Sequence, residues 1–260
     1  MKDEEKIVGW ILSVIIVVAF ILSYFSGQIN LPQIFPTTGS PASVPCGTLS
    51  TANGLYTMNE SVSVNGSTCF TVTAANITLD CAGFSITGTN ASSTYGVYST
   101  QTNTTVKNCN ISNFDTGIYY SGATYGIIEN NSVSTTINNQ AAPAYSSAIL
   151  LYSGASYNIL RNNNISSKYL GIFNYINTNN NNFTNNTINA GTTGFTQEQN
   201  AQNTSIDCQG ASITGSNTTS TYGVYSNQLN TTVRNCQISN FFTGVYLDST
   251  TNALIENNSI

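Results

Sequence analysis

Within residues 46–260, apolar side chains tend to lie two positions apart, in short runs separated by Asn, Gly and Ser. Examples of this spacing are Ile77 and Leu79, Ile118 and Tyr120, and Val245 and Leu247. A period of two is typical of β-strands, because successive side chains of a strand point to opposite faces. The pattern therefore predicts many short strands rather than helices.

A long repeat organises these segments. Residues 76–133 align without a gap on residues 203–260, and 36 of the 58 aligned positions are identical. One shorter series places an apolar residue two positions before an Asn: Val106/Asn108, Ile128/Asn130, Leu160/Asn162, Phe183/Asn185, Val233/Asn235 and Ile255/Asn257. A second series pairs Gly with an apolar residue: Gly96-Val97, Gly117-Ile118, Gly171-Ile172, Gly194-Phe195, Gly223-Val224 and Gly244-Val245. In the coil between the second and third of these pairs, Ala148-Ile149 takes the same place.

A period of about 22 residues with two or three short β segments predicts a solenoid. Each period would form one coil, stacked on the next at the strand spacing of about 4.8 Å, so that neighbouring coils bury each other's apolar face. The Asn doublets suit turns, since Asn tolerates the left-handed backbone conformation and its amide can bond the Asn one coil away. The sequence thus predicts an all-β fold, a parallel β-helix over residues 46–260.

The first 45 residues have a different composition. Ile7 to Phe25 is an uncharged stretch of 19 residues, which as a helix would reach roughly 28 Å, enough to cross a bilayer core. Lys2 and Lys6 precede it, and no Lys or Arg follows before Lys107. This asymmetry predicts a cytoplasmic tail at 1–6, a transmembrane helix at 7–25 that anchors the chain in the cell membrane, and an extracellular β-helix.

Residues 26–45 contain four of the five prolines, which predicts an extended stalk between the anchor and the β-helix. Two alternatives to a permanent anchor stay open, a cleaved signal peptide and a pilin-like leader cut near Gly9. At the other end the sequence stops at Ile260 in the middle of a repeat. We therefore expect the β-helix to continue in a longer protein.

The cysteines follow the repeat. Four of the six form two equivalent pairs, each 28 residues apart, which is one coil with a small insertion. Stacked coils place such residues near the Cα separation of a disulfide, about 4.4–6.8 Å, and an even number outside the cell favours oxidation. Free thiols stacked in the core are the alternative. The predicted disulfides are Cys46–Cys69, Cys81–Cys109 and Cys208–Cys236.

The composition of the chain restricts the classes of partner that it is expected to bind. The net charge is −5, and the excess of Lys and Arg expected of a nucleic-acid binder is missing. The chain has no His, the commonest metal ligand and general base, so we predict no metal site and no cofactor. Fourteen N-x-S/T sequons permit N-glycosylation outside the cell. The candidate glycosylation sites are Asn59, Asn65, Asn90, Asn103, Asn217 and Asn230.

Three runs carry a resemblance to a known group: NITLDCAGFSITG, TTVKNCNISNFDTGIYY and GIIENNSV. They resemble the right-handed parallel β-helix repeats of NosD-like surface proteins and of the broader group of carbohydrate-binding and sugar-hydrolase β-helices. Membrane-anchored, Cys-stapled versions are similar to archaeal cell-surface proteins. The resemblance covers about 46–260 and implies a right-handed fold, but it leaves function open, because such repeats occur in adhesins, lyases, hydrolases and accessory proteins.

Catalytic residues are hard to find in this sequence. Glycoside hydrolysis needs two carboxylates about 5–9.5 Å apart, whereas the eight Asp and Glu residues beyond the N-terminal segments include no Asp-Asp pair. Asp80 and Asp207 are equivalent in the long repeat, as are Lys107 and Arg234. We expect them in turns and surface ion pairs, and we predict no catalytic residue.

Binding has a better candidate. The residues that follow the apolar members of the Gly series should point outward, because side chains alternate along a strand. They predict an aromatic column on one outer sheet: Tyr98, Tyr119, Phe173, Tyr225 and Tyr246, with Leu150 in another coil. Such a column can stack against sugar rings, or it can be a self-stacking ladder that shields the sheet; both stay open. An insertion at Thr135–Ser147 is either a binding loop or a neutral loop.

The sequence favours a non-catalytic cell-surface protein, whose β-helix acts as a spacer or adhesin that binds polysaccharide, surface glycans or envelope proteins. One alternative is a polysaccharide-active lyase or hydrolase, with catalytic residues beyond Ile260 or unrecognised. Another is an accessory role of the NosD type, against which the lack of His and of Met-rich clusters argues.

Overall fold

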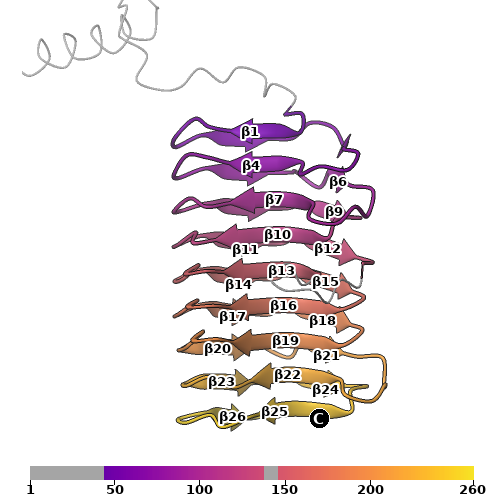
Figure 1. Ribbon diagram of the computed structural model, residues 1–260, viewed down its shortest axis with the longest axis vertical. Helices are drawn as coiled ribbons and strands as arrows, with labels where there is room; N and C mark the ends of the chain where they lie inside the picture. Colours follow the sequence, from indigo (N-terminus) through magenta and orange to yellow (C-terminus); the bar gives the residue numbers. More distant parts are fainter. Residues whose placement is uncertain (1–43, 138–145) are drawn as a thin grey trace, which may run out of the picture. The chain divides into compact units, whose positions relative to one another are not determined.

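The computed structural model describes residues 44–137 and 146–260, which form a parallel β-solenoid of the right-handed type (Figure 1). Successive coils contribute strands to three sheets, here named A, B and C, and each strand pairs in parallel with the equivalent strand of the next coil. The predicted parallel β-helix is therefore confirmed, with about nine coils.

The strands are short, as the period-two runs predict. Sheet A consists of β1 (Gly47–Leu49), β4 (Phe70–Val72), β7 (Tyr95–Ser99), β10 (Thr116–Ser121), β13 (Ser147–Tyr152), β16 (Leu170–Tyr175), β19 (Thr193–Glu198), β22 (Tyr222–Ser226) and β25 (Thr243–Leu247). Sheet B consists of β2 (Leu55–Thr57), β5 (Thr78–Asp80), β8 (Thr105–Lys107), β11 (Ile127–Glu129), β14 (Ile159–Arg161), β17 (Asn182–Thr184), β20 (Thr204–Asp207), β23 (Thr231–Arg234) and β26 (Leu254–Glu256). Sheet C consists of β3 (Val62–Ser63), β6 (Ser85–Thr87), β9 (Asn110–Ser112), β12 (Ser132–Thr135), β15 (Asn164–Ser167), β18 (Thr187–Ala190), β21 (Ser212–Thr214) and β24 (Gln237–Ser239).

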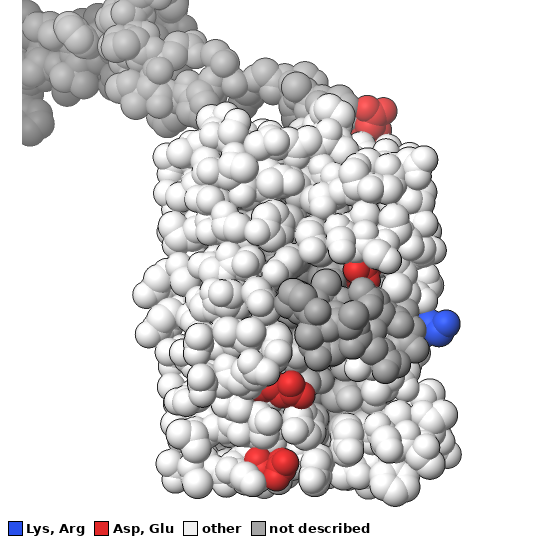
Figure 2. Space-filling model, viewed as in Figure 1, with Lys and Arg blue, Asp and Glu red and all other residues white. Residues whose placement is uncertain are grey.

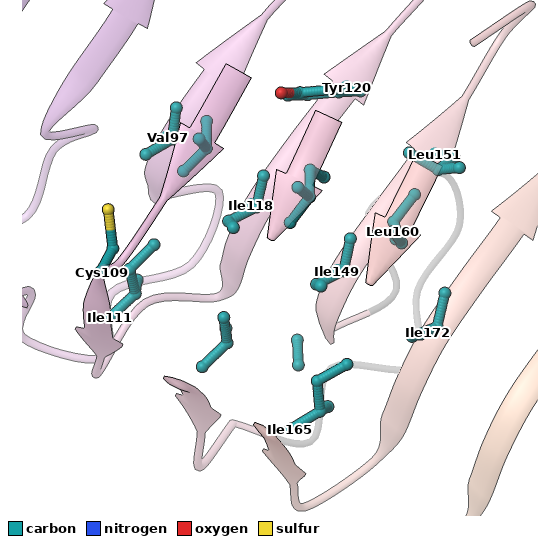
Figure 3. Close-up of a cluster of buried hydrophobic side chains, with 14 of the residues drawn as sticks. Val97, Cys109, Ile111, Ile118, Tyr120, Ile149, Leu151, Leu160, Ile165 and Ile172 are labelled. Carbon is teal, nitrogen blue, oxygen red and sulfur yellow. The ribbon is translucent and has the colours of Figure 1, made fainter. Parts of the chain in front are cut away.

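The core is a column of apolar side chains enclosed by the three sheets. Val97, Ile118, Ile149 and Ile172 pair in register along sheet A, and all four are fully buried. Figure 3 shows them one behind the next, facing Ile111 and Ile165 of sheet C. The inward orientation predicted for the apolar members of the Gly series is confirmed.

The glycines of that series allow adjacent elements to approach closely. At Gly194 of β19, a Cβ atom would lie 2.6 Å from the carbonyl oxygen of Gly223 in the next coil, and closer still to the side chain of Ile213. Real Cβ atoms do not come this near to other heavy atoms. The packing of one coil on the next therefore requires Gly at this position of β19, whereas Ala148 occupies the equivalent place in β13.

The two members of each Asn doublet have different roles. The first, such as Asn130 or Asn162, has a positive φ, of 55° and 56°. The second is buried and bonds along the column: the amide nitrogen of Asn131 donates to Asn163, and that of Asn163 donates to Asn186. A buried polar side chain is stable only when its hydrogen bonds are made, so these ladders keep the coils in register.

All three predicted disulfides are present. The Cα atoms are 4.5 Å apart in Cys46–Cys69, 4.7 Å in Cys81–Cys109 and 4.8 Å in Cys208–Cys236, and the described residues contain no free cysteine. The backbone N–H of Cys109 donates to the amide oxygen of Asn131. The two repeat-equivalent disulfides thus occupy the same corner of the coils as the Asn ladder, after the strands of sheet B, whereas Cys46–Cys69 directly precedes β1 and β4 of sheet A.

The predicted tail at 1–6, the anchor at 7–25 and nearly all of the stalk at 26–45 lie outside the described residues, as does most of the insertion. Within residues 44–137 and 146–260, the structure has no helix long and apolar enough to cross a membrane.

Candidate functional site

The predicted aromatic column lies on the outer face of sheet A. Strand pairing puts its members in one row across β4, β7, β10, β13, β16, β19, β22 and β25. The row reads Thr71, Tyr98, Tyr119, Leu150, Phe173, Thr196, Tyr225 and Tyr246. All five predicted aromatic residues are therefore aligned, with Leu150 between Tyr119 and Phe173.

Exposure along this row is uneven. Tyr246 is 41% exposed, whereas Phe173 is only 2% exposed. Phe173 lies in a small cluster with Leu150, Leu170 and Tyr175, separate from the main core, and its ring is 4.6 Å from that of Tyr175. Phe173 occupies its predicted place in the row, but it is buried by its neighbours, so the row does not form a continuous exposed stripe.

Two equivalent groups of three tyrosines lie on this face. In the first, the ring of Tyr119 is 4.9 Å from Tyr95 and 5.2 Å from Tyr98, and burial raises the pKa of Tyr119 to about 12. The second group, shifted by 127 residues in the sequence, consists of Tyr222, Tyr225 and Tyr246, with ring centroids 5.2–5.7 Å apart. The rings thus contact one another, as a self-stacking ladder would.

A groove of about 270 Å³ opens on sheet A between the buried cluster and the second tyrosine group. Leu170 and Phe173 of β16 line one side, and Tyr222 and Tyr225 of β22 line the other. On the intervening strand β19 the row has Thr196, a much smaller side chain. The groove exists because one coil carries a small residue where the adjacent coils carry rings.

Two polar groups of this groove have no hydrogen-bond partner in the part of the chain that the structure describes. Thr196 is 5% exposed, and its hydroxyl makes no hydrogen bond to any described residue. Glu198, at the end of β19, is partly buried and forms no ion pair or hydrogen bond within 44–137 and 146–260. Burial raises the pKa of Glu198 above its ordinary value. A buried hydroxyl without a partner is costly, and a ligand in the groove would supply one.

Sequence reasoning missed Thr196 and Glu198. The signal was the position after Phe195, where the series of aromatic residues is interrupted by Thr. A column of large rings with one small residue leaves a gap, but the size of that gap depends on how the neighbouring rings pack.

The carboxylates do not gather into a catalytic pair here. Among the described residues that line the groove, Glu198 is the one carboxylate. Asp115 is fully buried and accepts hydrogen bonds from the backbone N–H of Ser93 and the hydroxyl of Ser146. Within the described ranges, no three Asp, Glu or Cys side chains are placed to hold a metal ion.

The basic side chains of sheet B pair with carboxylates on adjacent strands, as expected. Lys107 lies 3.3 Å from Asp80, and Arg234 lies 2.9 Å from Asp207. Burial opposes ionisation of both aspartates, but hydrogen bonds, first from Asn108 or Asn235, together with the basic partner, lower the pKa of each. Arg161 likewise pairs with Glu129 at 2.6 Å.

The six candidate glycosylation sites are all exposed: Asn59, Asn65, Asn90, Asn103, Asn217 and Asn230. Asn103 and Asn230 differ from the others because their amide nitrogens donate to Asn76 at 2.7 Å and to Asn203 at 2.6 Å. A glycan on either nitrogen would disturb that bond. We therefore expect glycans at the other four sites in preference to these two.

Asn103 belongs to a second row of Asn residues, which occupy the same turn in successive coils. Two exposed tyrosines interrupt this row. Tyr125 and Tyr157 occupy turn positions with φ of 57° and 60°, where Asn76, Asn103 and Asn180 have similar angles. Their rings stack with centroids 5.0 Å apart, and they are 58% and 49% exposed. Aromatic residues rarely adopt this conformation, so the stacked pair is strained compared with the Asn it replaces.

No protein-family model matches the chain, and no curated protein matches its sequence. Solved structures with a similar fold include the A-module of a mannuronan C-5 epimerase from Azotobacter vinelandii, with 13% identity over 83% of this chain and 87% of that chain and a TM-score of 0.39. A periplasmic alginate epimerase has 13% identity over 82% and 72%, with a TM-score of 0.45. The catalytic unit of an α-1,3-glucanase from Streptomyces thermodiastaticus has 10% identity over 82% and 62%, with a TM-score of 0.28. Likeness at this level says nothing about what this chain binds.

Proposed function

We propose that the protein is a non-catalytic β-helix that binds polysaccharide on the outer face of sheet A, with its main contact in the groove over β19. The observation that carries this proposal is the combination of tyrosine rings with the buried, unpartnered hydroxyl of Thr196. Small-molecule sites are mostly apolar hollows with a few polar groups that fix orientation, and their volumes begin near 300 Å³.

A sugar unit fits this chemistry. Its ring faces carry C–H groups, which pack against aromatic side chains such as Tyr222 and Tyr225, and its edge carries hydroxyls. A sugar hydroxyl that bonded Thr196 would remove the cost of leaving that group unpaired. Because β-strands stack along the column, a chain of sugars could extend from the groove across the tyrosine rings of adjacent coils.

A polysaccharide-active enzyme is the second candidate, and one observation favours it. Glu198 is a carboxyl group with a raised pKa in a groove, which is the usual property of a general acid. Hydrolysis with two carboxylates would need a second such group nearby, and the described lining of the groove does not provide one. An accessory role of the NosD type has no supporting contact in the described residues.

The membrane anchor at 7–25 and an extracellular location belong to the same proposal. They rest on the uncharged stretch and on the distribution of Lys and Arg around it. In that arrangement, the stalk at 26–45 would hold the binding face away from the membrane, where it could meet glycans of the cell envelope.

The test is a binding titration of the full chain in detergent against neutral, amino and acidic polysaccharides, with products analysed in the same samples. We expect saturable binding without cleavage. Thr196→Val and Tyr225→Ala should each weaken binding by about tenfold, the effect of losing a group worth 1.4 kcal/mol.

Matched controls separate the groove from the rest of the row. Thr71→Val changes a threonine of the same row outside the groove, and Tyr98→Ala changes the repeat equivalent of Tyr225. Both should leave binding nearly unchanged. No binding to any polysaccharide would overturn the proposal, and product release would overturn its non-catalytic part.

A further inference from the structure

The groove over β19 is electrostatically one-sided. Glu198 is the one charged residue among its described lining residues, and no Lys or Arg is among them. On the side of the molecule shown in Figure 2, charged side chains are few and widely separated. A ligand with carboxylates would find no cation in this lining to neutralise it.

The basic residues of the described chain are placed elsewhere. Lys107, Arg161 and Arg234 lie on sheet B, where each pairs with a carboxylate of a neighbouring strand. The fourth, Lys168, is exposed between β15 of sheet C and β16 of sheet A and does not line the groove. None of these four cations is among the described residues that line the groove.

Among the described residues, Glu198 has no hydrogen-bond or ion-pair partner of the kind that a partly buried carboxylate normally has. Removing a charge from water without pairing it is unfavourable, and the raised pKa of Glu198 reports that cost. Burial, followed by the charges of Glu198 and Asp248, also raises the pKa of the adjacent Tyr225. A cation placed beside Glu198 would restore the missing interaction, and the faces of the Tyr222 and Tyr225 rings would attract it as well.

We propose that this groove selects polysaccharides with free amino groups, such as glucosamine polymers, over neutral and uronate polymers. The ammonium group of one sugar pairs with the Glu198 carboxylate, its ring packs against Tyr225, and one of its hydroxyls bonds Thr196. This inference rests on the proposed function, since it names the ligand class of the same groove. The ammonium adds a charge-assisted hydrogen bond to contacts that a neutral sugar also makes.

The experiment compares oligosaccharides of equal length with the full chain in detergent at low salt: glucosamine oligomers, N-acetylglucosamine oligomers and mannuronate oligomers. We expect glucosamine oligomers to bind about fivefold more tightly than the N-acetylated ones, the upper range for a solvent-accessible ion pair. Mannuronate oligomers should bind most weakly. The preference should shrink as salt is added, whereas binding of N-acetylated oligomers should not change.

Glu198→Gln is the decisive variant, because glutamine keeps the shape of the side chain and removes only its charge. It should abolish the preference for glucosamine and leave the binding of N-acetylated oligomers intact, which also shows that the variant is folded. Asp248→Asn is the control, a nearby carboxylate that does not line the groove, and it should keep the preference.

The outcomes separate this inference from the proposed function. If both neutral and amino oligomers bind equally, or if the preference survives in Glu198→Gln, the inference is wrong while glycan binding stands. Tighter binding of mannuronate would overturn the inference in the same way. If none of the three oligomers binds, this inference is wrong, and the titration against the wider set of polysaccharides decides whether the proposed function stands.

Discussion

The two copies of the long repeat, 76–133 and 203–260, are nearly the same sequence in two different settings. Both contain a disulfide that closes 28 residues, an ion pair from Asp to a basic residue, and a group of three tyrosines. In the first copy Tyr119 is partly buried, while its equivalent Tyr246 in the second copy is 41% exposed. The residues are alike, but the coils around them are not.

The differences between the copies occur where neighbouring coils differ. Asp115 of the first copy is fully buried between Ser93 and Ser146, whereas the equivalent Phe242 is 68% exposed. The strand β10 has partners on both sides, β7 and β13, while β25 is the last described strand of sheet A. In a solenoid each coil contacts only its neighbours, so an identical segment takes its burial from what stacks on it.

Among changes made in both copies of the repeat, removal of the disulfides should have the largest effect on the free energy of unfolding. In the chain-entropy account, a link that closes 28 residues contributes about 3.5 kcal/mol to the free energy of unfolding. We expect Cys81→Ala/Cys109→Ala to lower the stability of the whole column by this amount. In Cys208→Ala/Cys236→Ala, the loss should fall mainly on 203–260, because its last strands have a described neighbour on one side only. Denaturant unfolding with hydrogen exchange measures both, and an unchanged midpoint in the first variant would contradict the expectation.

Substitutions at Asp115 and at the equivalent Phe242 should give the next largest difference in the free energy of unfolding. Asp115→Ala leaves the N–H of Ser93 and the buried hydroxyl of Ser146 without this acceptor, at a cost of about 1–3 kcal/mol. Phe242→Ala, the matched change in the second copy, removes an exposed ring and should alter stability by no more than about 0.5 kcal/mol. Equal losses measured by thermal unfolding would mean that burial does not distinguish the two copies.

Substitution of the two tyrosines at the turn positions otherwise occupied by Asn should stabilise the fold. Tyr125 is equivalent to Asn252, and both have a positive φ, of 57° and 55°. Replacing both stacked tyrosines, Tyr125→Asn/Tyr157→Asn, should raise the free energy of unfolding by about 1 kcal/mol, because Asn accepts this conformation more readily. Asn252→Tyr should do the reverse in the second copy. A loss of stability in the double variant would show that ring stacking outweighs the strain.

Acid should produce the smallest effect. The pKa values of Asp80 and Asp207 are lower in the folded chain than their ordinary value, so each contributes stability above its unfolded pKa, near 3.9, and loses it as the pH falls through the lower folded pKa. Asp80→Asn and Asp207→Asn should each reduce the stability that is lost on acidification, by less than about 1 kcal/mol. Unfolding followed between neutral pH and pH 2 tests it, and an unchanged acid loss in both variants would contradict it.

Much of the fold was predictable from residues whose contacts lie within their own coil or with the adjacent coil. The Gly-apolar series, the Asn doublets and the cysteine pairs recur with the period of the solenoid, and each lies where the pattern placed it. The aromatic row was also predictable, because alternation along a strand decides which face a side chain occupies. Phe173 shows the limit of this reasoning, since it is in the row but is buried in a cluster with Leu150, Leu170 and Tyr175.

The sequence by itself determined the coils, their register and the side of the sheet on which each side chain lies, because these depend on spacing within one period. The tertiary structure alone decided that the rings of Phe173 and Tyr225 stand apart over Thr196, and that the described lining around Glu198 contains no cation. Spacing gives the order of side chains along a row, but a groove arises from the volumes of side chains in three adjacent coils packed together.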